Sequence, residues 1–470
     1  MIGVTLAKLD LDNKSLYWNI WQLAWPAALA GILMNFAHIV DRIFIGSLGV
    51  DQVTASGFAG SVVWFVFSFI QIVAAGAVAI VARHWGAEEF EEAEASGHRA
   101  VWLAAGLGFV FTVIVYLTAP LLIGFYQPTA AQYPMAVDYL RIFSPGFGLM
   151  MVAFTIHSAF SGSGDTRTGM FAFVSINGIN VLLNWLLIFG HWGFPALGIR
   201  GAALATTISH ALGTGVILLA YGLRWSNLSL RGFFGNRPRW PAIKRFLRIG
   251  LPATGQSITR PLTGMVMMAL ASRLTTPLPG GGVANFVATA FTIGMTALSF
   301  GQFFAQGLMA APAPLVGQFL GRDEPRRARE AANKVSVIGV VIQLFVAALF
   351  IFFGRELASI FLSGGNDYAT RHVLDMAHHY LIFIGLGSII SVLAWTYGGA
   401  FRGAGDTKPP MWGAIIANAA VKIPAAALGV FVFGWHDYSI WLAVFLSQIV
   451  EGLYIWLRFR QNHWMEVELA

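Results

Sequence analysis

The stretch FSGSGDTRTGM at residues 160–170 returns as FRGAGDTKPPM at residues 401–411, an offset of 241 residues. Other matches keep nearly the same offset, as a duplicated segment with small insertions would. The chain therefore consists of two related halves. The further matches are Tyr139 with Tyr380, Gly146 with Gly387 and Asn177 with Asn418 at 241, Gln71 with Gln306, Val81 with Val316 and Gly86 with Gly321 at 235, and Pro26 with Pro252 at 226.

Apolar segments of membrane-spanning length run through both halves. The 470 residues are 57% hydrophobic and 11% charged, whereas about 25% of a soluble chain is charged. Each segment has about 20 residues, which as a helix crosses roughly 30 Å of hydrocarbon and is too long for a barrel strand. We predict an all-α integral membrane protein with twelve transmembrane helices, at residues 23–46, 58–82, 100–123, 138–160, 170–190, 199–222, 249–272, 284–317, 334–354, 373–398, 411–434 and 439–459.

The distribution of basic residues predicts the orientation of these helices. The loop between the sixth and seventh spans is rich in arginine and lysine and carries no acidic residue, so the positive-inside rule places it in the cytoplasm together with both termini. We read the net charge of +7 as this loop bias and not as a sign of nucleic-acid binding. Six spans per half give two parallel repeats: an N-lobe at 1–225, a cytoplasmic linker at 226–245 and a C-lobe at 246–470.

Several motifs in this order resemble the multidrug and toxic-compound extrusion (MATE) family, and the resemblance covers nearly the whole chain. Besides the doubled GDT loops, the stretches that carry it are WP at 25–26 with VDRIFIG at 40–46, NVLLNWLLIFG at 180–190 with LGIRGAALAT at 197–206, and PLVGQFLG at 314–321.

The resemblance implies a secondary active antiporter that exports bulky, often cationic organic compounds in exchange for H⁺ or Na⁺. It implies a V-shaped pair of lobes that alternate between inward-open and outward-open states, with the closest likeness to the DinF-like branch. We expect a multi-pass protein of the cell inner membrane, a monomer without a cofactor, whose partners are small organic substrates and the lipid bilayer. The alternative within the same superfamily is a flippase for a lipid-linked precursor.

Asp41 is the candidate coupling residue, because a carboxylate inside a span is costly and marks function by default. Asn35 and His38 precede it at intervals of three residues and share its helix face. An exposed aspartate at the outer helix end is the alternative. By resemblance, Asp41 lines up with the proton-coupling aspartate of the family.

Asn177, Asn180 and Asn184 form a polar stripe on the fifth span. Buried amides need hydrogen-bond partners, so the stripe either joins helices or contributes to a site. By resemblance, Asp41, Asn180, Asn184 and Thr206 form the N-lobe cation site. Some relatives have an aspartate in place of Asn184, so this chain offers one charge there, which favours H⁺ over Na⁺.

Two further N-lobe residues have open roles. Pro26 lacks an N–H and bends a helix interior; it is a hinge by resemblance, and a static kink otherwise. Tyr139 is either an anchor at the membrane interface or, by resemblance, a residue beside the N-lobe pocket.

The C-lobe carries different charges. Arg260 lies in the seventh span where the acidic branch of the family has a glutamate, and Lys422 and Glu451 lie in the last two spans. We expect Lys422 and Glu451 to pair with each other or with backbone groups, or Glu451 to make a buried structural link. Cations in the cavity would favour zwitterionic, anionic or neutral substrates. Gln306 in the eighth span is a candidate cavity residue.

Enzyme chemistry is not supported by the sequence. No Ser/His/Asp grouping, HExxH motif or Cys/His cluster occurs. The GDT loops lack the Lys-Ser/Thr pair and the preceding strand of a phosphate-binding loop. We expect their glycines to form tight turns and Asp165 and Asp406 to cap helices.

Overall fold

The computed structural model describes residues 9, 11–274, 276–277, 283–284, 286–360 and 368–467, apart from the side chains at 35, 38, 50, 276–277, 283–284, 298–306, 368 and 369. Helices account for most of this part of the chain, and its one small sheet pairs β1 (Thr276–Pro277) with β2 (Val283–Ala284) in antiparallel fashion.

The N-lobe contains six membrane helices, the second of which is built from three consecutive pieces. The elements are α1 (Leu16–Gly46), α2 (Val50–Phe67) with η1 (Ser68–Ile70) and α3 (Gln71–Gly86), α4 (Phe90–Gly124), α5 (Gln132–Gly162), α6 (Arg167–Phe189) and α7 (Ile199–Gly222), with the short η2 (His191–Gly193) between the last two.

The C-lobe repeats this order, with α9 and α10 in the place of α2 and α3. Its elements are α8 (Trp240–Arg273), α9 (Phe286–Ala310) with α10 (Pro312–Gly321), α11 (Pro325–Ser359), α12 (Tyr368–Ala404), the row α13 (Lys408–Ile415), η3 (Ile416–Lys422), α14 (Ile423–Leu428) and η4 (Gly429–Phe433), then α15 (His436–Arg460) and η5 (His463–Glu466). Both η3 and η4 are π-helical.

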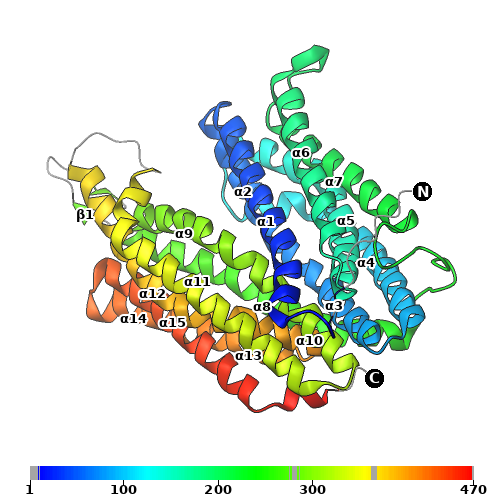
Figure 1. The fold of residues 1–470 in the computed structure, drawn as a ribbon. Helices are drawn as coiled ribbons and strands as arrows, with labels where there is room; N and C mark the ends of the chain where they lie inside the picture. The colour runs from blue at the N-terminus through cyan, green and yellow to red at the C-terminus, as the bar shows by residue number, and fades with distance from the viewer. Residues whose placement is uncertain are drawn as a thin grey trace.

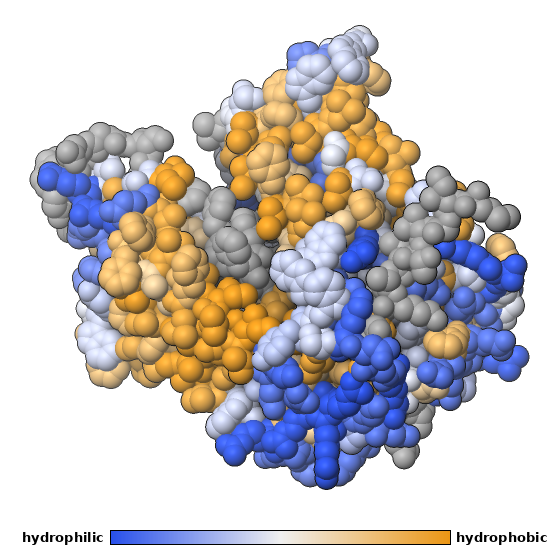
Figure 2. Space-filling model, in the orientation of Figure 1, coloured by the Kyte–Doolittle hydropathy of each residue, from blue (hydrophilic) through white to orange (hydrophobic). Residues whose placement is uncertain are grey.

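The predicted architecture of twelve membrane helices in two lobes is confirmed. Within the described residues, 10 helical stretches are long and apolar enough to cross a membrane, and α8 and α9 supply the remaining two by their place in the repeat. Most helices extend several residues beyond the predicted spans, because a helix continues past the hydrocarbon layer. Hydrophobic residues cover the flanks of both lobes and hydrophilic residues gather at one end (Figure 2).

The two lobes meet at the end where α1, α8 and α11 begin and α15 ends, which we call the basic end. Contacts between the lobes pair α3 with α8 and α10, and α1 with α9. Away from this end the lobes diverge into a V (Figure 1).

Glycines make the contacts at the basic end, and they do so in reciprocal pairs. A Cβ at Gly86 would overlap the carbonyl oxygen of Gln318, and a Cβ at Gly321 would overlap that of Arg83. The offset of 235 residues converts one pair into the other. Backbones of α3 and α10 therefore touch across a pseudo-two-fold axis.

A second reciprocal pair lies deeper in the same interface. A Cβ at Gly250 of α8 would overlap the carbonyl oxygen of Ile72, and a Cβ at Gly307 of α9 would meet that of Ala24 in α1. The repeat offsets of 226 and 235 residues again relate the two contacts. The duplication is thus visible in the interface that joins the lobes.

The GDT loops are tight turns, as predicted. Gly164 and Gly405 have φ of 88° and 81°, a region that favours glycine. The amides of Asp165 and Asp406 donate to the carbonyls of Phe160 and Phe401, both at 2.9 Å. Asp165 also caps α6, since its Oδ1 accepts from the Thr168 amide at 3.0 Å.

We predict that Gly86→Val opens the basic end. Overpacking costs about 1–3 kcal/mol, and here the added side chain destabilises only the closed state, in which α3 touches α10. Since the chain has no cysteine, Gln318→Cys, a buried position in this contact, reports opening through its reaction with a membrane-impermeant maleimide. The labelling rate should rise about tenfold when Gly86→Val is added.

The matched control is Gly106→Val on α4, where a Cβ would meet nothing within 4 Å. It should leave the labelling rate unchanged. Equal labelling with and without Gly86→Val would show that this contact does not hold the lobes together.

Candidate functional site

A chain of hydrogen bonds joins the four residues of the predicted N-lobe cation site. Asn184 Nδ2 donates to Asp41 Oδ1 and, at 3.1 Å, to Asn180 Oδ1. Asn180 Nδ2 donates to Thr206 Oγ1 at 3.3 Å. This N-lobe polar chain (Asp41, Asn184, Asn180 and Thr206) connects α1, α6 and α7.

One acceptor in this chain is open. Asn184 is 1% exposed, and its Oδ1 has no hydrogen-bond partner in the described structure. A buried carbonyl oxygen without a donor costs free energy. Beside Asp41 it can accept a hydrogen bond from a protonated carboxyl, or contribute to the binding of a cation.

Tyr139 and Asn177 take different positions relative to the polar chain. Tyr139 of α5 packs beside Ile45 of α1 and lies close enough to Asp41 for an electrostatic interaction. Asn177 donates instead to the Phe173 carbonyl of its own helix at 2.8 Å. Of the three asparagines on α6, Asn180 and Asn184 thus belong to the polar chain, whereas Asn177 bonds to the backbone of its own helix.

The remaining N-lobe candidates are placed only in part. Pro26 lies inside a continuous α1, next to Ala24 and Ala28, which meet Gly307 of α9. The side chains of Asn35 and His38, and that of the C-lobe candidate Gln306, lie outside the described residues.

The C-lobe contains a second group of paired charges. Arg260 of α8 forms an ion pair with Glu451 of α15 at 3.2 Å, and its guanidinium lies 3.4 Å from the centre of the Trp395 ring. Lys422 Nζ donates to Asn418 Oδ1 at 2.8 Å. We call these five residues the C-lobe charge cluster.

This pairing differs in part from the expectation. Glu451 does make the buried link, but its contact is with Arg260, and Lys422 bonds to an amide side chain. Lys422 remains close enough to Glu451 and Arg260 for electrostatic interaction with both. The contact of Trp395 with Arg260 was not predicted, because a single tryptophan in an apolar span gives no sequence signal for a cation–π contact.

A family model described as MatE matches residues 26–186 and 252–428. The chain belongs to the MatE family. One matched segment lies in each lobe, and the resemblance stated from the motifs is confirmed. A similar curated protein is the probable multidrug resistance protein NorM of Thermotoga maritima, which is 26% identical over 94% of this chain and 92% of its own length.

Solved structures show the same MatE-family fold. One, described as the outward-facing conformation of a multidrug resistance MATE family transporter of the MOP superfamily, has a TM-score of 0.83 at 19% identity and covers 97% of this chain and 98% of its own. A second, a MOP superfamily transporter from Pyrococcus furiosus, has a TM-score of 0.85 at 19% identity with the same coverage.

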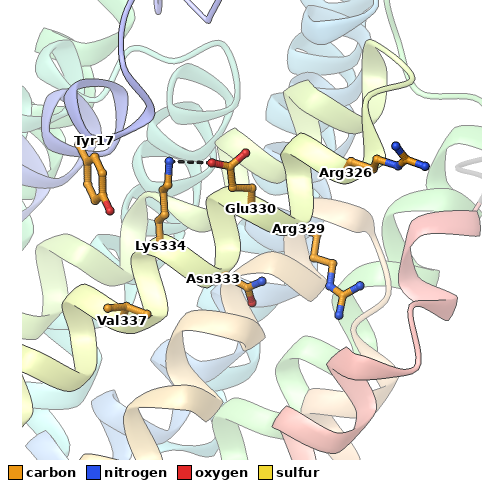
Figure 3. A pocket seen from close by; sticks show the side chains of 7 residues that line it. All are labelled: Tyr17, Arg326, Arg329, Glu330, Asn333, Lys334 and Val337. Atoms are coloured by element: carbon orange, nitrogen blue, oxygen red, sulfur yellow. Dashed lines mark ion pairs between the residues drawn. The ribbon is translucent and has the colours of Figure 1, made fainter.

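A separate pocket of about 320 Å³ lies at the basic end of this MatE-family chain. Figure 3 shows Lys334 between Glu330, its ion-pair partner at 2.7 Å, and Tyr17 of α1. Arg326 and Arg329 complete its basic lining. Because it is formed by the first turns of α11 and α1, it belongs to neither the polar chain nor the charge cluster.

Replacing Asn184 should destabilise the protein more than replacing Asn177. Asn184→Leu removes the donor to the Asp41 carboxylate, and hydrogen bonds to charged groups contribute about 1.5–3 kcal/mol. Asn177→Leu removes only a bond within one helix. Thermal unfolding of both variants in the same detergent measures the difference, and equal midpoints would show that the polar chain adds no stability.

Removing either partner of the C-lobe ion pair should cost more than removing both. Arg260→Met leaves the Glu451 carboxylate buried without its ion-pair partner, which should lower the free energy of unfolding by about 3 kcal/mol for a partly exposed pair. Glu451→Gln leaves the Arg260 guanidinium without its carboxylate. The double variant should recover part of this loss. Thermal midpoints of the four proteins form a double-mutant cycle, in which strict additivity would rule out a direct interaction.

Proposed function

We propose that this protein is a secondary active antiporter that exports organic compounds in exchange for protons that enter through Asp41. The observation that carries the proposal is the hydrogen-bonded contact of Asp41 with Asn184 inside the N-lobe. Membership of the MatE family and the description of NorM as a probable multidrug resistance protein support the export of drug-like compounds.

The mechanism rests on competition between proton and substrate. Asp41 lies in the last turns of α1, at the end where the lobes diverge. A proton from the outer solution neutralises the carboxylate and weakens the binding of a cationic substrate. Once the lobes reopen at the basic end, the proton leaves to the cytoplasm and the anionic site is restored. Each ligand favours the state that it binds better.

The small number of open oxygen ligands in the N-lobe polar chain favours H⁺ over Na⁺ as the coupling ion. A hard cation binds several oxygens at once, but Asn180 Oδ1 already accepts from Asn184, and Thr206 Oγ1 accepts from Asn180. The open acceptors are the Asp41 carboxylate and Asn184 Oδ1. One proton needs no more than these, and Na⁺ coupling is the competing outcome of the test below.

The proposed orientation follows from charge. The basic end carries Arg326, Arg327 and Arg329 of α11 together with the arginine-rich segment before α8. The positive-inside rule assigns this end, and with it both termini, to the cytoplasm of a cell inner membrane. The structure is then outward-facing. Pro26 would serve as the hinge of α1 between Asp41 and the closed basic end.

A flippase for a lipid-linked precursor is the second candidate. The excess of positive charge in the C-lobe charge cluster favours it, because such precursors carry phosphate groups. The Pyrococcus furiosus relative of similar fold is described with a binding pocket of reverse polarity that suggests a different function.

Efflux from proteoliposomes tests the antiport proposal. Wild-type protein should drive a fluorescent organic cation against its gradient when a pH gradient is imposed. Asp41→Asn should abolish this transport, because an amide side chain cannot take up and release a proton as the carboxylate does. The control Asp51→Asn changes an exposed carboxylate at the same end of the N-lobe and should transport normally.

Other outcomes would revise the proposal. Transport driven by a Na⁺ gradient alone would assign Na⁺ as the coupling ion. Unaltered proton-driven transport by Asp41→Asn would remove Asp41 from coupling. Wild-type protein that moves no organic cation but moves a lipid-linked phosphate would favour the flippase.

A further inference from the structure

We infer that the C-lobe charge cluster binds an oxyanion group, a carboxylate or phosphate, of the transported molecule, so that zwitterionic compounds are preferred to simple cations. This rests on the proposed function and adds a substrate class to it. The cluster consists of Arg260, Lys422, Glu451, Asn418 and Trp395.

The cluster carries more positive than negative charge. Two cationic side chains, Arg260 and Lys422, face one carboxylate, Glu451. Arg402 of α12 lies close enough to Arg260 for repulsion between like charges. Charges inside a span are costly unless paired. A bound anion would supply the missing negative charge.

Arg260 and Lys422 both have hydrogen-bond donors that no described side chain uses. Arg260 makes one contact with Glu451, at 3.2 Å, although a guanidinium has five N–H donors. Trp395 covers the face of the guanidinium at 3.4 Å and leaves its in-plane N–H groups uncovered; among the described side chains these groups bond to Glu451 alone. The Arg260 side chain is 30% exposed. Among the described residues, Lys422 donates one hydrogen bond, to Asn418, of the three that an ammonium can make.

Comparison of the two repeats shows that the charge of Lys422 has no counterpart in the N-lobe. Asn418 donates to the carbonyl four residues earlier at 2.9 Å, as its counterpart Asn177 does at 2.8 Å. The residue one turn later is Lys422 in the C-lobe and Val181 in the N-lobe. Fold stability in the N-lobe is achieved without this charge, so the repeat itself does not require it.

The backbone around Lys422 supports a ligand site. Asn418 and Lys422 both lie in the π-helical segment η3, and π-helical segments are frequent at functional sites. Within this segment, Lys422 lies near Arg260 and Glu451, which come from α8 and α15 and form an ion pair with each other. Three separate helical segments therefore converge on one point.

A matched pair of fluorescent probes tests the inference. Rhodamine 110 carries a free carboxylate, and rhodamine 123 is its methyl ester, so the two differ only in the group that the cluster should recognise. Fluorescence anisotropy with purified full-length protein measures binding independently of transport. We expect Lys422→Met to weaken rhodamine 110 binding about tenfold or more and to change rhodamine 123 binding less than twofold.

Further variants keep the result interpretable. Glu451→Gln should strengthen rhodamine 110 binding, because it removes the competing carboxylate and raises the net charge. Lys334→Met, the same substitution in the pocket at the basic end, should affect neither probe. An equal effect of Lys422→Met on both probes would overturn the inference. So would no effect on either probe, which is the result expected if Lys422 is uncharged.

Two comparisons separate the possible failures. If rhodamine 123 is exported under a pH gradient but the probes bind alike in all variants, the antiport proposal stands and the inference fails. If neither probe is exported, the antiport proposal fails while anisotropy still decides on the anion site. A competition experiment in nanodiscs identifies the source of the oxyanion. If phosphatidylglycerol displaces rhodamine 110 from wild type but not from Lys422→Met, the anion site is confirmed and its oxyanion belongs to a lipid headgroup. That result would overturn the proposal that the site binds a transported zwitterion.

Discussion

Polar side chains within a membrane must find partners inside the protein, and this constraint determines both candidate sites. In the N-lobe it produces a neutral relay of amides and a hydroxyl that ends on Asp41. In the C-lobe it produces an ion pair backed by an aromatic ring. Each arrangement leaves one requirement unmet, an open acceptor at Asn184 and an excess of positive charge beside Lys422. Those unmet requirements are where ligands are expected.

The sequence was sufficient for the fold and for the N-lobe set because both follow from local pattern. Apolar length defined the helices, and the doubled motif defined the lobes. Asn180 and Asn184 lie one helical turn apart, so they were bound to share a face. Asn177 lies three residues before Asn180, close to the same face, yet it bonds to its own backbone. Rotamer choice decides between these outcomes, and periodicity carries no information about rotamers.

Pairing in the C-lobe could not be predicted for a different reason. Arg260 and Glu451 are 191 residues apart, and the N-lobe has no equivalent pair to serve as a template. The sequence indicated three charges within spans but not their geometry. The outcome is a duplicated scaffold whose halves have opposite polarity, with an acid in one and a surplus of cations in the other.

The glycine contacts at the basic end have a consequence for the energetics of switching. Where backbone touches backbone, as Gly86 does Gln318 and Gly321 does Arg83, a glycine has no side chain to be immobilised when the lobes come together. Closure of the lobes therefore costs little side-chain conformational entropy at these contacts, and their separation regains little. An interface of this kind can hold its two states within a few kcal/mol of each other, so that the binding of one proton or one small molecule is enough to tip the balance.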